Sequence, residues 1–315
     1  LETPSPHLAL ARALDAPTGR PDFAPRPKPT PPVDRRPREL PVTGVERWVR
    51  DPYATYARYV LRLKPLDRPG QSADALLRGQ AIHKALERFV NDWPHALPDD
   101  TGERINALLI EELVGAGFDT PAMARETPLA ANSARWLAGF EAARRARGID
   151  ILTEQRAALD MVRPGGAFRL TAKIDRVELS ATGAAILDFK TGAPPGKDEV
   201  KVGFAPQLTL TGAILAAVGV GDAGPVEAEE LTYVRVIGRR KPGEIKTPGS
   251  GAEAAALSQA AFEGLCARID RFDDAATPYL SWVAPKYMGN LGGNYDHLAR
   301  VWEWMVVGGE TEASE

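Results

Sequence analysis

Apolar residues recur along this chain with two different periods. The change from one period to the other divides the chain into a first part that predicts helices and a later part that also predicts strands. In the first half they recur at helical intervals, which predicts helices over 43–56, 72–92, 103–114 and 131–146. Apolar and β-branched runs then predict strands over 151–162, 168–179 and 184–189, followed by a helix over 207–218, a strand over 231–237, a helix over 252–272 and a short helix over 295–304. This order predicts an α/β fold, with a mixed central sheet flanked by helices and a helical subdomain before it.

Local signals at the start of the chain predict where the folded part begins. Thr43 and Glu46 have the spacing of a capping box, and Pro52 predicts a break within the first helical segment. Many prolines and arginines fall between Pro21 and Pro41, so residues 1–41 are expected to form an extended linker. Because the sequence begins at Leu1 without Met, we expect a piece of a longer polypeptide, with the linker joining it to an upstream region. The expected division is a linker over 1–41, a helical part over 42–148, a sheet core over 149–240, C-terminal helices over 250–305 and a flexible tail over 306–315.

The strands over 168–179 and 184–189 flank a Ser-Ala-Thr-Gly turn and predict a β-hairpin that carries charge. Asp175 lies in its first strand, and Asp188 and Lys190 lie at the end of the second. Residues two apart on a strand point to the same side, so Asp188 and Lys190 should face one site while Phe189 turns into the core. Two acids and a lysine held on strands suit a divalent metal and the water it activates.

Taken alone, an Asp and a Lys two positions apart are usually solvated strand charges. Other polar residues in the sequence strengthen the interpretation of this pair as part of a functional site. His83 and Glu87 are four apart and share one helix face, although a lone helical His is more often structural than a ligand. Glu154 lies near the start of the first predicted strand, and Gln207 begins an apolar helix. By themselves these would be an exposed strand charge and a helix-terminal polar residue.

The net charge, the cysteine content and the length of the apolar runs limit which partners and cofactors this chain can have. The formal net charge is −3, so a nucleic acid would have to be met by a local basic patch. Candidates are Arg176 and the cluster Arg239, Arg240 and Lys241, although a solvated turn explains the cluster at least as well. The single cysteine, Cys266, excludes a disulfide framework, a zinc cluster or a cysteine-ligated iron–sulfur cluster and suits a reducing compartment. No apolar run is long enough to span a membrane, so we expect a cytoplasmic protein without a membrane partner.

Taken together, these motifs resemble the RecB-type branch of the PD-(D/E)XK nuclease superfamily. The resemblance rests on Gly79-x-x-x-His83-x-x-Leu-Glu87, Asp175-Arg176, Asp188-Phe-Lys190-Thr-Gly192 and Gln207, in that order. It implies a restriction-endonuclease-like core that binds Mg²⁺ or Mn²⁺ through His83, Asp175, Asp188 and the backbone carbonyl of Phe189. It also implies that Asp175, Asp188, Lys190 and Gln207 are catalytic, with Glu87 and Glu154 as additional candidates.

The resemblance is closer still to the C-terminal nuclease domains of the AddB family. It adds the stretches Trp48–Arg58, Leu170–Arg176, Ala205–Leu208 and Tyr295–Val301. It implies a bacterial exonuclease domain that trims DNA at double-strand breaks beside an AddA-type helicase–nuclease subunit. Thr211 stands where many relatives have a Tyr, and the four-cysteine iron–sulfur cluster of some relatives cannot form here. Two alternatives stay open, namely a catalytically silent DNA-holding module and a related nuclease that acts on another nucleic acid.

Overall fold

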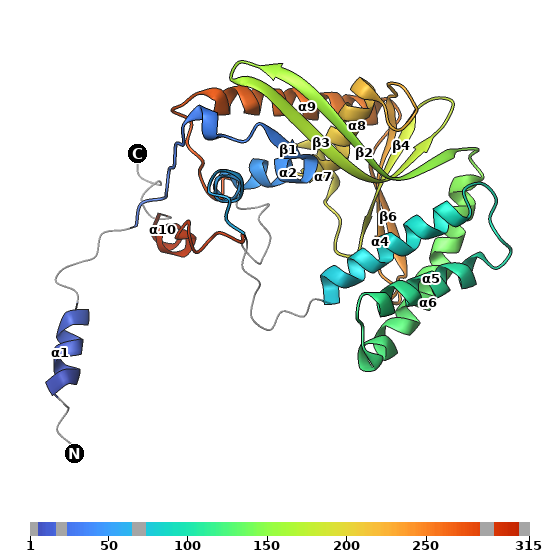
Figure 1. Cartoon of the computed structure of the whole chain (residues 1–315), viewed down its shortest axis with the longest axis horizontal. Helices are drawn as coiled ribbons and strands as arrows, with labels where there is room; N and C mark the ends of the chain where they lie inside the picture. The colour runs from blue at the N-terminus through green and yellow to red at the C-terminus, as the bar shows by residue number, and fades with distance from the viewer. Residues whose placement is uncertain (1–5, 17–23, 65–73, 284–292, 309–315) are drawn as a thin grey trace.

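The computed structural model of this chain describes residues 6–16, 24–64, 74–283 and 293–308 (Figure 1). The helices are α1 (Pro6–Asp15), η1 (Val33–Arg35, 3₁₀), α2 (Val42–Arg50), α3 (Pro52–Thr55), η2 (Tyr56–Val60, π), α4 (Asp74–Asp92), α5 (Thr101–Gly115), α6 (Thr120–Arg145), α7 (Lys197–Lys201), α8 (Gln207–Val218), α9 (Ala252–Asp273) and α10 (Val301–Gly308). The strands are β1 (Glu39–Pro41), β2 (Asp150–Arg163), β3 (Gly166–Leu179), β4 (Ala184–Lys190), β5 (Ala228–Val236) and β6 (Gly243–Ser250). The expected α/β class is confirmed.

The six strands form one mixed sheet in the order β1-β3-β4-β5-β6, with β2 paired to β3. The long β2–β3 hairpin is antiparallel along its whole length. The other edge of β3 is shared, because β1 pairs with it in parallel at 169–171 and β4 pairs with it antiparallel at 176–179. β4 and β5 are parallel, and α7 and α8 lie on the connection between them. The predicted hairpin and its turn are therefore confirmed.

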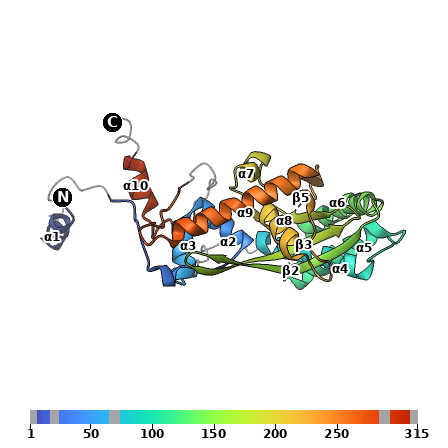
Figure 2. The same ribbon diagram turned by 90° about the horizontal axis from the view of Figure 1, so that it is seen from above.

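Helices cover both faces of the sheet (Figures 1 and 2). One apolar core joins α2, α8 and α9 to Ala184 and Ile186 of β4 and to Leu231 and Tyr233 of β5. A second core joins α4, α5 and α6 to the alternate residues of the same strands, such as Phe189. Because alternate side chains of β4 enter different cores, its end lies between the two helical layers. Phe189 points into the second core, as predicted.

The alternation of faces is broken in the β2–β3 hairpin, next to Asp175. Leu170, Ala172 and Ile174 pack into the α2–α8–α9 core, but further along β3 it is Val177 that does so. At the break, Glu154 and Asp175 occupy facing positions in the register but form no ladder pair. Glu154 has a φ of 52°, in the left-handed region that costs energy for a residue with a side chain. The irregularity lets Asp175 and Arg176 both leave this core, which neighbouring residues of a regular strand cannot do.

Several boundaries differ from the sequence-based expectations. α2 begins at Val42 with Pro41 as its N-cap and no side-chain cap, so the expected capping box at Thr43 is wrong. The expected break at Pro52 is confirmed by the start of α3. α6 begins at Thr120, because Asp119 caps it and the helix continues through Pro128. Residues 72–73 of the next expected helix lie outside the described residues, while its remainder is α4.

Other elements were not expected at all. The strands β1 and β6 and the helices α1 and α7 had no clear apolar period. The C-terminal helix α10 begins at Val301, later than the expected 295, and extends to Gly308, beyond the expected tail start at 306. Residues 309–315 lie outside the described part of the chain. No helix that the structure describes is both long enough and apolar enough to cross a membrane.

The described residues of the expected linker pack against the domain. Leu40 is completely buried, and β1 belongs to the sheet. The buried guanidinium of Arg36 donates to the carbonyls of Phe272, Asp274 and Ala275 at the end of α9. The packing of the folded domain thus begins before residue 42, while the wider division of the chain stays a prediction. Residues 1–5 and 17–23 lie outside the described residues.

A third apolar cluster joins two of the stretches that carried the AddB-type resemblance. Tyr53, Ala54 and Ala57 of α3 and η2 pack against Tyr295 and Val301. The Tyr295 hydroxyl donates to the carbonyl of Leu63 at 2.7 Å, and the amide of Tyr53 donates to the carbonyl of Leu280. Segments far apart in the sequence are therefore held together by ordinary apolar packing and hydrogen bonds.

Candidate active site at the end of β4

On the α4 side of the sheet, four elements bring polar groups together. His83 of α4 lies over the end of β4, with its Nε2 2.9 Å from the carbonyl oxygen of Phe189. Its Nδ1 lies 3.5 Å from Oδ2 of Asp175, and that oxygen accepts a hydrogen bond of 2.9 Å from the amide of Phe189. Ligand atoms of His83, Glu154 and Asp175 all lie within 4.8 Å of one another. The structure thus gathers three donors from α4, β2 and β3.

On the α8 side of the sheet, three further residues form a second group. Nζ of Lys190 lies 2.7 Å from Oδ2 of Asp188 and donates to Oε1 of Gln207 at 3.1 Å. The Gln207 amide donates to the other oxygen of Asp188. Gln207 reaches both because it is the first residue of α8, directly after Pro206. The expected pairing of Asp188 and Lys190 on one face is confirmed, and the first turn of α8 completes it.

Burial sets the electrostatics of this group. Asp188 is 5% exposed, and burial, together with the nearby negative charge of Asp175, raises its pKa to about 6 despite Lys190. For His83, burial opposes protonation, but the hydrogen bond and charge of Asp175 and the charge of Asp188 outweigh it and raise the pKa. Oδ2 of Asp188 accepts no well-formed hydrogen bond from the described residues, although Lys190 is close. A buried carboxylate oxygen with spare acceptor capacity favours a cation as its partner.

The donor set fits a divalent metal ion. Carboxylate oxygens suit Mg²⁺, and an imidazole nitrogen extends the range to Mn²⁺. The three gathered donors are His83, Glu154 and Asp175, so Glu154 belongs to the group more directly than the resemblance implied. Asp188 lies outside that group, with its carboxylate turned to Lys190 and Gln207. The carbonyl of Phe189 is at the site but contacts His83. The full ligand set stays a prediction.

The remaining expected residues fall in different places. Glu87 lines the same cavities as His83 but does not belong to the three-donor group. Arg176 is 1% exposed and forms ion pairs with Glu141 and Glu178, so its assignment to DNA binding is wrong. The break in strand alternation turns it into the protein interior, where two buried carboxylates enclose it.

The basic cluster lies on the β5–β6 connection. Arg239, Arg240 and Lys241 are exposed, and Lys241 pairs with Glu244 at 3.2 Å. Gly238 beside them abuts the backbone of Leu129 in α6. The cluster is therefore accessible to a nucleic acid, and its role stays a prediction.

Two residues of the site were not singled out in the sequence. Tyr233 of β5 pairs in register with Asp188, and its buried ring lies 5.9 Å below Nζ of Lys190. Burial and then the charge of Asp188 raise the pKa of its phenol. Lys173 lies two residues before Asp175 and forms an ion pair with Glu154. The position of Lys173 was visible in the sequence, since residues two apart on a strand share a side.

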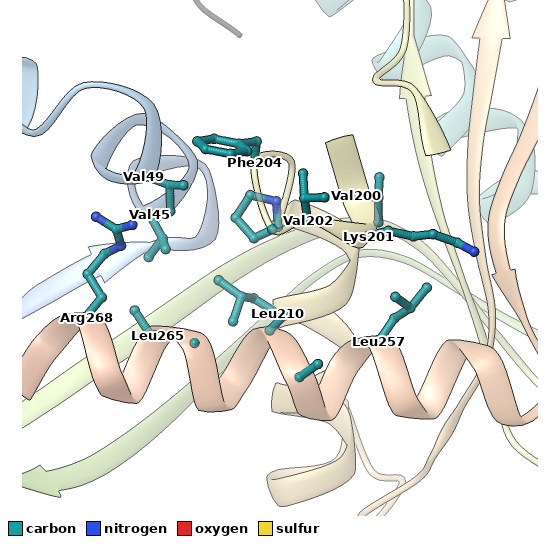
Figure 3. Close-up of a pocket in the computed structure, with 15 residues that line it drawn as sticks. Val45, Val49, Val200, Lys201, Val202, Phe204, Leu210, Leu257, Leu265 and Arg268 are labelled. Carbon is teal, nitrogen blue, oxygen red and sulfur yellow. The ribbon is translucent and has the colours of Figure 1, made fainter. Parts of the chain in front are cut away.

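Cavities confirm which surface is accessible. A cavity of about 470 Å³ opens beside the candidate metal-ligating group of His83, Glu154 and Asp175, and its lining includes His83, Lys84, Glu87, Glu154, Lys173 and Thr191. A separate cavity of about 250 Å³ lies between α2, α8 and α9. Figure 3 shows Arg268 beside Val45 and Val49 at one end of it and Lys201 at the other. None of the described residues that line this second cavity is acidic, so of these two cavities the one beside α4 is better suited to a metal ion.

Comparison with known proteins agrees with this geometry. The model of the PD-(D/E)XK nuclease superfamily matches residues 39–281. The chain is 29% identical over 189 residues to an uncharacterized protein of Rickettsia felis, covering 58% of this chain and 22% of that protein. It is 25% identical over 217 residues to an uncharacterized protein of Rickettsia bellii, covering 64% of this chain and 26% of the relative.

The match to these relatives thus spans about a quarter of their length. A solved structure described as "Crystal structure of SSO0001" aligns over 82% of both chains, with 9% identity and a TM-score of 0.30, which is too small a likeness to bear on function. The family match, in contrast, covers the sheet, α4 and α8, and therefore all the residues gathered at the end of β4. This chain belongs to the PD-(D/E)XK nuclease superfamily.

Proposed function

We propose that this chain is a metal-dependent deoxyribonuclease domain that removes nucleotides from the ends of DNA strands. The observation that carries the proposal is the meeting of two groups at the end of β4. His83, Glu154 and Asp175 gather within 4.8 Å on one side, and Asp188, Lys190 and Gln207 contact one another on the other. A metal-binding group beside a buried carboxylate and a lysine suits hydrolysis of a phosphodiester.

Each residue has a role that follows from its contacts. When bound, Mg²⁺ or Mn²⁺ supplies positive charge that stabilises the phosphate in the transition state and makes water a stronger nucleophile. His83, Asp175 and Asp188 would hold the ion, with Glu154 as a further ligand and the carbonyl of Phe189 nearby. Lys190 orients the attacking water and offsets negative charge on the phosphate. Gln207 holds the ammonium of Lys190 and the carboxylate of Asp188 in their relative positions.

A nucleic acid is the substrate class that the basic groups around the site support, and the resemblance to AddB-type domains makes DNA the proposed one. Lys84 and Lys173 line the cavity beside the metal-ligating group, and Arg235 pairs in register with Lys190. Arg239, Arg240 and Lys241 extend this positive charge along the β5–β6 connection. Such contacts bind phosphates without reading sequence, and binding should therefore weaken as salt rises.

The wider setting follows from the stretches that resemble AddB-type domains. We propose that the domain trims DNA ends at double-strand breaks in the bacterial cytoplasm and acts beside an AddA-type helicase–nuclease subunit that delivers an unwound strand. The packing of Tyr53 against Tyr295 supports this setting, because it joins two of those stretches. Adding the purified AddA-type subunit should increase the rate of strand degradation. An unchanged rate would argue against this partnership without bearing on the hydrolysis itself.

The decisive experiment is degradation of single-stranded DNA labelled at either end, with Mg²⁺, Mn²⁺ or EDTA. Wild-type protein should release labelled nucleotides only with metal, and Asp188→Asn should abolish release while circular dichroism shows a folded protein. Asp160→Asn is the matched control, since this exposed carboxylate lies on β2 outside the site. Cleavage by Asp188→Asn at the wild-type rate would contradict the proposal. Faster degradation of an RNA of the same sequence would replace DNA as the substrate.

A further inference from the structure

Lys173 both lines the cavity where DNA would bind and contacts a candidate metal ligand. It lies on β3 two residues before Asp175, and its ammonium pairs with Oε2 of Glu154 across the hairpin. The Lys173 side chain is 64% exposed, whereas that of Glu154 is only 17% exposed. Glu154 in turn is one of the three residues that gather for a metal ion. The lysine therefore contacts a metal-ligand candidate from the solvent side.

We propose that Lys173 is a substituting counter-ion, which neutralises Glu154 when no metal is bound and turns to a phosphate of the DNA strand when metal occupies the site. This inference rests on the proposed function. It assigns to Lys173 a positioning role that couples metal binding to strand binding.

Glu154 needs a positive partner. Its carboxylate lies near that of Asp175, and two carboxylates this close repel each other unless a cation lies between or beside them. The backbone of Glu154 is held at a φ of 52°, so the chain maintains this position at a cost in energy. Lys173 supplies the missing charge through its ion pair with Glu154.

Lys173 and a divalent cation would compete for one carboxylate, that of Glu154. A lysine–glutamate pair whose ammonium is largely exposed is weak, because water screens it. A divalent cation held by three protein donors outcompetes such a pair readily. The affinity for metal is nevertheless lower than it would be without the competing ammonium, by the free energy of the displaced ion pair.

The ammonium of Lys173, once displaced from Glu154, can turn into the neighbouring cavity. Lys173 lines the cavity of about 470 Å³ beside His83 and Thr191, which is the accessible cavity next to the metal-ligating group. A flexible, exposed lysine at such a cavity suits a non-bridging phosphate oxygen as a point charge. Metal binding would thus free Lys173 to contact a phosphate of the DNA at the moment when the site becomes competent for hydrolysis.

Lys84 offers a matched control. It lines the same cavity and its side chain is equally exposed, at 64%, but its ammonium pairs with Glu112 and not with Glu154. Replacing either lysine with Met removes one positive charge from the same cavity. A purely long-range effect of charge on metal affinity should therefore appear in both variants, whereas competition for Glu154 should appear in one.

The test is titration of Mn²⁺ and Ca²⁺ into the metal-free protein by calorimetry, without DNA. Lys173→Met should bind Mn²⁺ about 3- to 5-fold more tightly than wild type, the factor that corresponds to loss of a weak ion pair. Lys84→Met should differ from wild type by less than about twofold, and Lys173→Arg, which keeps the charge, should resemble wild type. Equal tightening in both Met variants, or none in Lys173→Met, would overturn the proposed competition.

The second readout is binding of a fluorescent oligo-dT strand in Ca²⁺ at low salt. Lys173→Met should bind the strand several-fold more weakly and with a shallower salt dependence, although it binds metal more tightly. A merely structural role would not move the two affinities in opposite directions. Unchanged strand binding in Lys173→Met would overturn the phosphate contact. If wild type cleaves DNA while these variants match it in both assays, only this inference fails, whereas a wild type that binds no metal would refute the proposed function itself.

Discussion

Asp175 and Arg176 are neighbours in β3, yet they belong to two charge networks of opposite character. Arg176 is fully enclosed between Glu141 and Glu178, and Arg144 extends the network to Glu178 and Glu230. In this network each of these carboxylates has an arginine partner. Asp175 instead belongs, with Glu154 and Asp188, to what we call the open group, a set of acids at the end of β4 beside a cavity. In this group Glu154 is held in a left-handed conformation, and the cations beside Glu154 and Asp188 are the partly exposed lysines Lys173 and Lys190.

The difference separates groups that hold the fold from groups available for chemistry. A closed network of ion pairs leaves no position for a ligand, and its removal exposes buried charge. An open group keeps carboxylates whose negative charge is only weakly neutralised, so a metal ion can bind there and a phosphate can bind to the metal and the lysines. The closed network also fastens α6 to β3 and β5, so it supports the sheet on which the open group is built.

The largest expected effect is on catalysis. Replacing Lys190 with Met should lower the rate of DNA degradation about 10²- to 10⁴-fold, because the charge beside Asp188 and Gln207 is lost. Initial rates in Mg²⁺ measure this. Lys197→Met is the control, since that lysine is half exposed and pairs with Glu253. Equal rates in the two variants would show that Lys190 does not take part in catalysis.

The next effect is on stability. Arg176→Met should lower the free energy of unfolding by about 3–5 kcal/mol, because Glu141 and Glu178 are left buried without their partner. Urea denaturation measures this loss, and adding Glu141→Gln should cost less than the sum of the single changes. Affinity for oligo-dT should stay at the wild-type value under conditions where the variant is folded. A loss below about 1 kcal/mol would mean that the closed network does not hold the fold.

The two networks should respond to pH with opposite signs. Burial raises the pKa of Asp188 to about 6, so its contribution to stability is present at low pH and lost as pH rises through 6. Asp188→Asn should therefore raise the free energy of unfolding in EDTA at pH near 7.5, by on the order of 2 kcal/mol, and not at pH near 4.

Glu230 represents the closed network in the same experiment. Burial alone would raise its pKa, but Arg147 and Arg144 outweigh burial and lower it below 4.5. Its contribution is present above that value and lost as pH falls through the lowered pKa. Glu230→Gln should accordingly lower the free energy of unfolding at pH near 7.5, and the deficit should shrink on acidification. Urea curves at several pH values test both variants, and shifts of the same sign would contradict the contrast.

The smallest effect concerns the backbone of the open group. Because Glu154 has a φ of 52°, Glu154→Gly should be more stable to urea than Glu154→Ala by about 1 kcal/mol. Glycine adopts this conformation without a steric penalty, and both variants lack the carboxylate. In a regular strand the order would be reversed, with alanine the more stable, and that result would show that the strain is absent.

Much of the fold was predictable because local periods and tertiary packing agree. The hairpin of β3 and β4, the helix over 207–218 and the facing of Asp188 and Lys190 follow from side-chain alternation and apolar period alone. His83, Asp175, Asp188, Lys190 and Gln207 were expected together, and the structure brings them to the end of β4. β1 escaped prediction because only its pairing with the distant strand β3 makes it a strand. β6 pairs with β5 directly before it, and it escaped prediction because its residues, which include Pro248 and Gly249, show no apolar alternation.

The sequence by itself determined the chemistry of this protein and the order of its elements, because both depend on residue types and on spacing within single helices and strands. Only the tertiary structure decided the fate of Arg176, since a break in alternation opposite Glu154 turns it into the interior. The same break places Glu154 within reach of His83 and leaves Lys173 at the mouth of the cavity. Such a break depends on two strands pairing through their whole length, and a periodic reading of either strand alone assumes that its alternation is regular.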